Sequence, residues 1–142
     1  MEGMFQDCMQ FNSNLKRWNT KNVENMKFMF EDAASFNQDI SSWNVSNVKD
    51  MGYMFADAEL FNQDISGWNV SNVENMDAMF MASEFTGENG DISDWDVSNV
   101  TDIWGMFTRS KFNGNIDDWD VSSISSMAGN TFWDSPLEKN VP

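Results

Sequence analysis

The chain has 142 residues, a formal net charge of −15 and no histidine. Such an acidic surface repels phosphate backbones and argues against nucleic-acid binding, and the missing histidine removes the commonest general base and transition-metal ligand. No run of about 18 apolar residues is present, so membrane insertion is not expected.

The N-terminus begins in mid-repeat at Met4-Phe5 and lacks the charged start and apolar run of a signal peptide. We therefore expect this sequence to be part of a longer exported chain. Its first repeat would expose Met4, Phe5 and Phe11, and would be capped by other sequence or pair end to end with another chain. The segment 131–136 resembles a stop to the repeats, because terminal repeats need polar caps.

Tryptophans recur along the chain at intervals of 24 to 27 residues: Trp18, Trp43, Trp68, Trp95 and Trp119. A constant period of this length is typical of stacked supersecondary units. The sequence therefore predicts one domain of repeats over about 5–29, 30–54, 55–79, 80–106 and 107–134, followed by a tail over 135–142.

Each repeat combines two hydrophobic periods. Around the second tryptophan, Trp43 and Val45 alternate with polar neighbours, which predicts a short strand. The next apolar positions follow a helical spacing of three, four and three: Val48, Met51, Phe55 and Ala58. These periods predict an α/β repeat solenoid of about five short parallel strands, each followed by a helical turn or short helix.

Other columns of the repeat are expected to be core. Cys8 aligns with Ala33 and Ala58, so we expect a small core residue and not a nucleophile. The methionines repeat in helical register at Met26, Met51, Met76 and Met127, and at Met29, Met54, Met79 and Met106.

The repeat also has specific words, Phe-Asn-Gln-Asp-Ile-Ser-x-Trp and Asn-Val-Ser-Asn-Val. The spacing Ile40-x-x-Trp43-x-Val45-x-Asn47-Val48 is similar to the strand signature of leucine-rich repeats. The whole unit resembles the repeat of BspA-like proteins, a group of bacterial surface lipoproteins and adhesins. This resemblance implies a leucine-rich-repeat fold, a role in attachment at the cell surface or outside the cell, and no catalytic residues.

Polar residues recur at the turns. Two asparagine columns, and an aspartate column at Asp39, Asp64 and Asp91, are expected to satisfy backbone groups. Glycan binding for the asparagines and a shared cation for the aspartates are the alternatives. The asparagine columns are Asn12, Asn37, Asn62 and Asn113, and Asn22, Asn47, Asn72 and Asn99.

The outward residues beside the tryptophans change sign along the chain. They begin with basic Arg17 and Lys21, continue through Asn44 and Asn69, and end with Asp94, Asp96, Asp118 and Asp120. This face is either solvated surface or a recognition surface for a protein or glycan. The four aspartates are also a possible site for a cation such as Ca²⁺.

Two further features are candidate recognition elements. Trp104 occupies a column that is otherwise tolerant of polar residues, near the aromatic positions Phe28 and Tyr53. These aromatics could contact a partner or pack on neighbouring turns. The segment 85–91 carries three residues more than its counterparts, which predicts a surface loop.

Periodic columns without a singular constellation of reactive groups argue against an enzyme. The sequence predicts a non-enzymatic, adhesion-type interaction module that binds a protein or glycan. A purely structural spacer and a calcium-stiffened solenoid are the alternatives.

Overall fold

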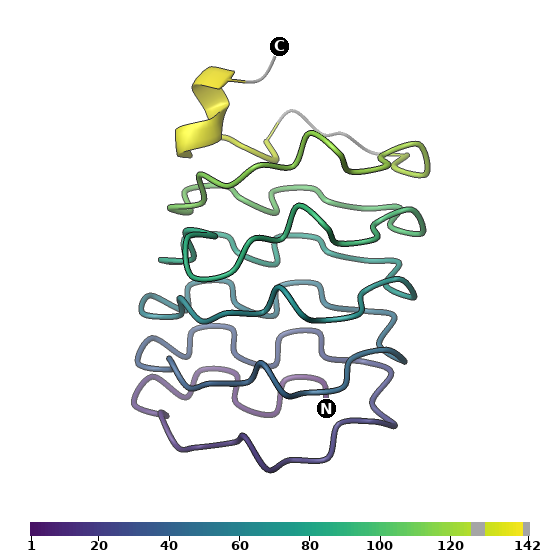
Figure 1. The fold of residues 1–142 in the computed structure, drawn as a ribbon. Helices are drawn as coiled ribbons and strands as arrows, with labels where there is room; N and C mark the ends of the chain where they lie inside the picture. The colour runs from purple at the N-terminus through teal and green to yellow at the C-terminus, as the bar shows by residue number, and fades with distance from the viewer. Residues whose placement is uncertain (126–129, 141–142) are drawn as a thin grey trace.

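A computed structural model describes residues 1–125 and 130–140. The chain winds into coils that lie one above another, from the N-terminal coil at one end to the C-terminal segment at the other (Figure 1). One regular element is present in the described part of the chain, a 3-10 helix, η1 (Pro136–Asn140), which lies at the end of the stack. Isolated parallel bridges join Asn25 to Asp50, Asp50 to Asn75 and Asn75 to Asp102.

The prediction of an α/β solenoid of the leucine-rich-repeat kind is wrong. The residues that the structure describes contain no α-helix and no sheet of paired strands. Successive repeats do stack, but each coil is a series of tight turns.

Left-handed backbone explains why the apolar stripe is not a helix. Tyr53 has a φ of 56° and Asp57 a φ of 53°, and a right-handed helix requires a φ near −63° at every residue. The same two columns are left-handed along the stack, at Phe28 and Asp32 and again at Ala78 and Ala82. Tandem turns can therefore keep a spacing of three and four that is otherwise typical of a helix.

The backbone hydrogen bonds of this segment alternate between two directions. Four N–H groups donate to carbonyls of the following coil at 2.7 to 2.9 Å: Met51 to Asn75, Tyr53 to Asp77, Phe55 to Met79 and Asp57 to Met81. The N–H groups between them donate three residues back, which closes the turns, with Met54 bonded to Met51, Ala56 to Tyr53 and Ala58 to Phe55. Every donor is satisfied without the i to i−4 bonds of a helix.

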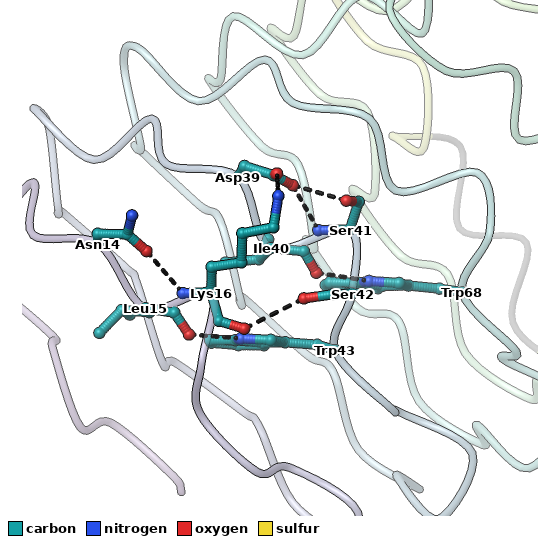
Figure 2. Close-up of polar contacts among 9 residues, drawn as sticks. All are labelled: Asn14, Leu15, Lys16, Asp39, Ile40, Ser41, Ser42, Trp43 and Trp68. Carbon is teal, nitrogen blue, oxygen red and sulfur yellow. Dashed lines mark hydrogen bonds and ion pairs between the residues drawn. The ribbon is translucent and has the colours of Figure 1, made fainter.

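The predicted strands fail for a different reason. Turns bracket the segment on both sides, because the Trp43 N–H donates to the Ile40 carbonyl and the Val48 N–H donates to the Val45 carbonyl. The segment between them is too short for a ladder, and side chains link the coils instead. Figure 2 shows the indole nitrogen of Trp43 donating to the Leu15 carbonyl at 3.0 Å and that of Trp68 donating to the Ile40 carbonyl at 3.2 Å.

Phenylalanines form a continuous ring stack through the core. Phe55 and Phe61 of one coil lie 3.8 Å apart between centroids, and Phe55 lies 5.7 Å from Phe30 and 5.8 Å from Phe80 in the adjacent coils. All of these rings are fully buried. The seven methionines of the predicted columns that lie in the described residues are also buried, and Met127 lies outside those residues.

Six of the eight asparagines in the two columns bind backbone, as predicted, and Asn22 and Asn113 have no side-chain hydrogen bond in the described residues. The Asn37 side-chain oxygen accepts the Asn62 N–H at 3.0 Å, and the Asn12 oxygen accepts the Asn37 N–H in the same way. In the second column, the Asn72 amide donates to the Ser46 carbonyl at 2.7 Å. These side chains replace the backbone ladder at the corners of each coil.

The first coil departs from the predicted burial. Trp18 is 39% exposed, whereas Trp43, Trp68 and Trp95 are each 4% exposed. Cys8 is also exposed, so its prediction as a core residue is wrong. Both residues belong to a coil that no other described coil covers on its N-terminal side (Figure 1).

The segment 85–91 is a packed bulge and not a loose loop. Thr86 takes the asparagine position and donates its N–H to the Asn62 side chain at 3.1 Å. A Cβ atom on Gly90 would lie 2.1 Å from an oxygen of Asp64, and one on Gly87, whose φ is +78°, would lie 2.7 Å from the Phe112 ring. Only glycine fits these two positions without a shift of neighbouring atoms.

Candidate interaction surface

The outward turn beside each tryptophan has the same internal geometry in successive coils. We call this surface, formed by the residues one before, one after and three after each tryptophan, the tryptophan-turn face. The Asn44 side-chain oxygen accepts the Ser46 N–H at 3.0 Å and the Ser46 hydroxyl at 2.7 Å. Asn69 binds Ser71 in the same way. Asn44 and Asn69 are therefore exposed and held in fixed orientations.

Aspartates take over this role in the last two tryptophan coils. Asp96 accepts the Ser98 N–H at 3.1 Å, and Asp120 accepts the Ser122 N–H at 3.0 Å. Hydrogen bonds from these serines, first from the side chain and then from the backbone, lower the pKa of both carboxyls. Asp96 and Asp120 are therefore ionised at neutral pH.

Asp94 and Asp118 complete the acidic end of this face. Both are exposed, and each directly precedes a buried tryptophan, Trp95 or Trp119. The two coils are tied together by the Trp119 indole, which donates to the Ile92 carbonyl at 3.0 Å. The four aspartates thus lie on adjacent turns, but the described residues contain no group of three or more His, Cys, Asp or Glu side chains that could hold a metal ion.

The opposite end of the tryptophan-turn face is basic. Lys16, beside Arg17, forms an ion pair with Asp39 at 2.8 Å, and Asp39 also accepts the Ser41 N–H and hydroxyl (Figure 2). The Lys16 and Ser41 hydrogen bonds hold the pKa of Asp39 well below its usual range. Asp39 and Asp64 therefore act as turn acceptors, which was the first of the two expectations for this column.

The structure places Trp104 in another column, beyond the corner that contains Asn99 and Thr101. Trp104 is 37% exposed, and its N–H donates to the Asp102 side chain at 2.9 Å. In the neighbouring column, the rings of Phe28 and Tyr53 lie 5.3 Å apart at an interplanar angle of 40°. These half-buried rings contact one another, so at least this pair has a packing role.

Sequence reasoning missed two features of the surface. An open depression is lined by Lys49, Asn72, Glu74, Asn99 and Thr101 on three neighbouring coils. We call the tandem-turn segment of each coil, residues 51–58 and their equivalents, the Met-Phe side. Three acidic groups on this side, Glu31, Asp57 and Asp77, have raised pKa values, with burial as the largest cause in each case. Their recurrence beside apolar columns was visible in the sequence, but their partial burial depends on the tandem turns.

Asp77 provides a test of this acidic set. One of its oxygens is buried and has no hydrogen-bond partner among the described residues, and burial followed by the charge of Asp102 raises the pKa of Asp77. A raised pKa in the folded state means that Asp77 favours folding only at acid pH, and opposes it as pH rises through that pKa. We expect Asp77→Asn to raise the unfolding midpoint at pH 7, with the gain disappearing below the ordinary aspartate pKa of about 3.9.

Asp39→Asn is the matched control, because the pKa of Asp39 is shifted the other way. The stability that Asp39 contributes is fully present above the unfolded-state pKa and is lost only as pH falls through its lowered folded-state pKa. This variant should therefore be less stable at pH 7, and most of the loss should persist at pH 3. The Lys16–Asp39 pair is exposed, and the expected loss is about 0–1 kcal/mol. Thermal melts of both variants at pH 3 and pH 7 measure the difference, and equal pH dependence in the two variants would contradict it.

Comparison with known proteins gives one assignment. No curated protein and no solved structure matches the chain. No helix in the described residues is long and apolar enough to cross a bilayer. A family model described as "Mycoplasma protein of unknown function, DUF285" matches residues 1–89 and again residues 81–140. Because these matches cover nearly the whole sequence, the chain belongs to this family.

Proposed function

We propose that the protein is a non-enzymatic interaction module that binds a basic protein segment through the acidic end of its tryptophan-turn face. The proposal rests on a change in the charge of the exposed residues along a structure that otherwise repeats from coil to coil. The tryptophans and their hydrogen bonds repeat from coil to coil, while the exposed residues beside them change from Arg17 and Lys21 to aspartates.

The acidic end supports this function because its charges are fixed in position. Asp96 and Asp120 are held by their serines, so little side-chain freedom is lost when a partner binds. A partner with lysines or arginines at a matching spacing would meet ionised carboxylates on adjacent turns. Charge complementarity of this kind increases the association rate and selects among partners.

The cellular setting is part of the same proposal. The words Phe-Asn-Gln-Asp-Ile-Ser-x-Trp and Asn-Val-Ser-Asn-Val resemble the repeats of BspA-like surface proteins, although the leucine-rich-repeat fold of that resemblance does not apply here. We infer that the module works at the cell surface or outside the cell. A basic protein segment on another cell or in the surrounding matrix would be its ligand.

The test replaces Asp94, Asp96, Asp118 and Asp120 together by asparagine, because asparagine keeps the turn acceptor and removes only the charge. Binding to immobilised basic proteins and to a glycan array would be measured at low and at physiological ionic strength. We expect the unmodified chain to bind basic proteins, and the variant to bind about tenfold more weakly or not at all. Salt should weaken the remaining interaction.

A matched control removes the same number of charges elsewhere, by changing Glu24, Glu59, Glu84 and Glu88 to glutamine. These residues are exposed, and their side chains have no hydrogen bond in the described structure. An equal loss of binding in both variants would show that only net charge matters. Binding to glycans alone would replace the proposed ligand class, and no binding to either array would favour a structural spacer.

A further inference from the structure

The two ends of the stack are chemically different, because the hydrogen bonds between coils have a direction. In the Met-Phe side of each coil, N–H groups donate to the following coil. Gly3, Phe5 and Asp7 donate to the carbonyls of Lys27, Met29 and Glu31 at 2.9 Å. The carbonyls of Glu2, Met4 and Gln6 are the equivalent acceptors in the first coil, and no described group donates to them.

The rest of the first coil presents unpaired donors. In later coils, the tryptophan indole donates to a carbonyl of the preceding coil, as Trp43 does to Leu15, whereas the Trp18 indole has no acceptor in the described structure. The Lys49 N–H donates to Glu24, and the Asn47 amide donates to Lys21. The equivalent groups of the first coil are also unpaired within the described residues: the Glu24 N–H and the Asn22 side-chain amide.

Apolar surface accompanies these groups. Phe5 and Phe11 stack at 4.0 Å between centroids, and Phe5 lies 5.5 Å from the Trp18 ring, so the core stack continues to the N-terminal end. Met4 is 48% exposed and Met9 is 64% exposed. An end with this many exposed large apolar side chains has the character of a contact surface.

At the C-terminal end, η1 takes the place of a further coil at one position. In earlier coils the N–H group at the position of Asp134 donates to the next coil, as Arg109 does to the Trp133 carbonyl. The Asp134 N–H itself donates to the Glu138 carboxylate at 2.9 Å, so a side chain from η1 replaces the carbonyl of a further coil. Leu137 of η1 packs against the core.

We propose that the N-terminal end of the stack is a docking surface for one coil of the same repeat, presented by its C-terminal side in parallel register. Only such a coil supplies N–H donors opposite Glu2, Met4 and Gln6 together with a carbonyl opposite Trp18. A second copy of this chain fits less well by its C-terminal end, because Glu138 of η1 already accepts the Asp134 N–H and Leu137 occupies part of that end. Two N-terminal ends would place carbonyls of the Met-Phe sides against carbonyls.

The docking surface is separate from the acidic end of the tryptophan-turn face, so this inference does not rest on the proposed function. The probe is one coil of the chain itself, residues 51–75, joined directly ahead of Met1 in the intact protein. The junction Asn75–Met1 then reproduces the natural junction between residues 75 and 76 in register. The control is a fusion of the same 25 residues in permuted order.

Hydrogen exchange read by mass spectrometry would follow the amides of residues 10–24 of the original chain, and thermal unfolding would follow stability. With the in-register coil, we expect exchange in this segment to slow by about tenfold or more, and a single unfolding transition at a higher temperature. The permuted fusion should change neither. Unchanged exchange with the in-register coil, or equal protection by both fusions, would overturn the proposal.

Sedimentation of the unmodified chain adds an independent outcome. A monomer over the accessible concentration range, with the N-terminal segment exchanging fast, is the expected result. Concentration-dependent dimers that protect residues 10–24 and disappear in Trp18→Asp would show that a second copy covers this end, which would also overturn the proposal.

Discussion

Replacing Phe55 by alanine is expected to lower the free energy of unfolding by about 3–5 kcal/mol, the usual cost of truncating a buried phenylalanine. Phe55 is fully buried and contacts rings of its own coil and of both neighbouring coils. Its neighbours are held by coil-to-coil hydrogen bonds and cannot collapse into the space. The cavity should therefore remain and interrupt the ring stack. Urea unfolding followed by tryptophan fluorescence measures the loss.

Two controls separate the core from the surface of the same stack. Leu60 is 56% exposed, so Leu60→Ala should change the free energy of unfolding by less than about 0.5 kcal/mol. Phe5 stacks on Phe30 but is only partly buried at the open end, so Phe5→Ala should have an intermediate effect. Similar losses for Phe5→Ala and Phe55→Ala would contradict the continuous stack.

The sequence was sufficient to predict which columns are buried but not which backbone carries them. In the internal coils, the phenylalanine, methionine and tryptophan columns that include Phe55, Met51 and Trp68 are in the core, whereas Trp104 is 37% exposed. The spacing of three and four, however, fits both a helix and two tandem turns. Two columns indicated the turns: glycine at Gly3 and Gly105, and aspartate at Asp7, Asp32 and Asp57. Both residue types tolerate left-handed backbone, and all five of these residues have positive φ.

The surface, too, could be predicted only in part from the sequence. Asn44, Asn69 and the four aspartates are outward, as their alternation with Trp and Val predicts. Alternation could not show that Asn44, Asn69, Asp96 and Asp120 each bind the serine two positions on, because that bond belongs to a turn and not to a strand. The burial of Cys8 and Trp18 was overestimated because a repeat pattern treats all coils alike, whereas the first coil has a described neighbour on one side only.

Replacing Trp68 by phenylalanine is expected to cost about 1–3 kcal/mol of unfolding free energy. The change removes the indole N–H that donates to the Ile40 carbonyl at 3.2 Å, and it leaves a smaller ring in a site that is 4% exposed. The Ile40 carbonyl keeps its bond from the Trp43 N–H, so the cost should stay below that of a wholly unpaired buried carbonyl. Urea denaturation, compared with that of the unmodified chain, measures the difference.

Trp18→Phe is the matched control for this bond, because it makes the same chemical change in a coil where the indole has no described acceptor. Trp18 is 39% exposed, and its replacement should cost less than about 0.5 kcal/mol. Equal losses of unfolding free energy in Trp68→Phe and Trp18→Phe would mean that the indole bonds do not hold the coils together. A much larger loss in Trp68→Phe would mean that side chains hold neighbouring coils together in this segment. This would explain how the tryptophan turns can stack without the backbone ladder of a sheet. The exposed residues beside each tryptophan can then change charge from coil to coil without altering the bonds beneath them.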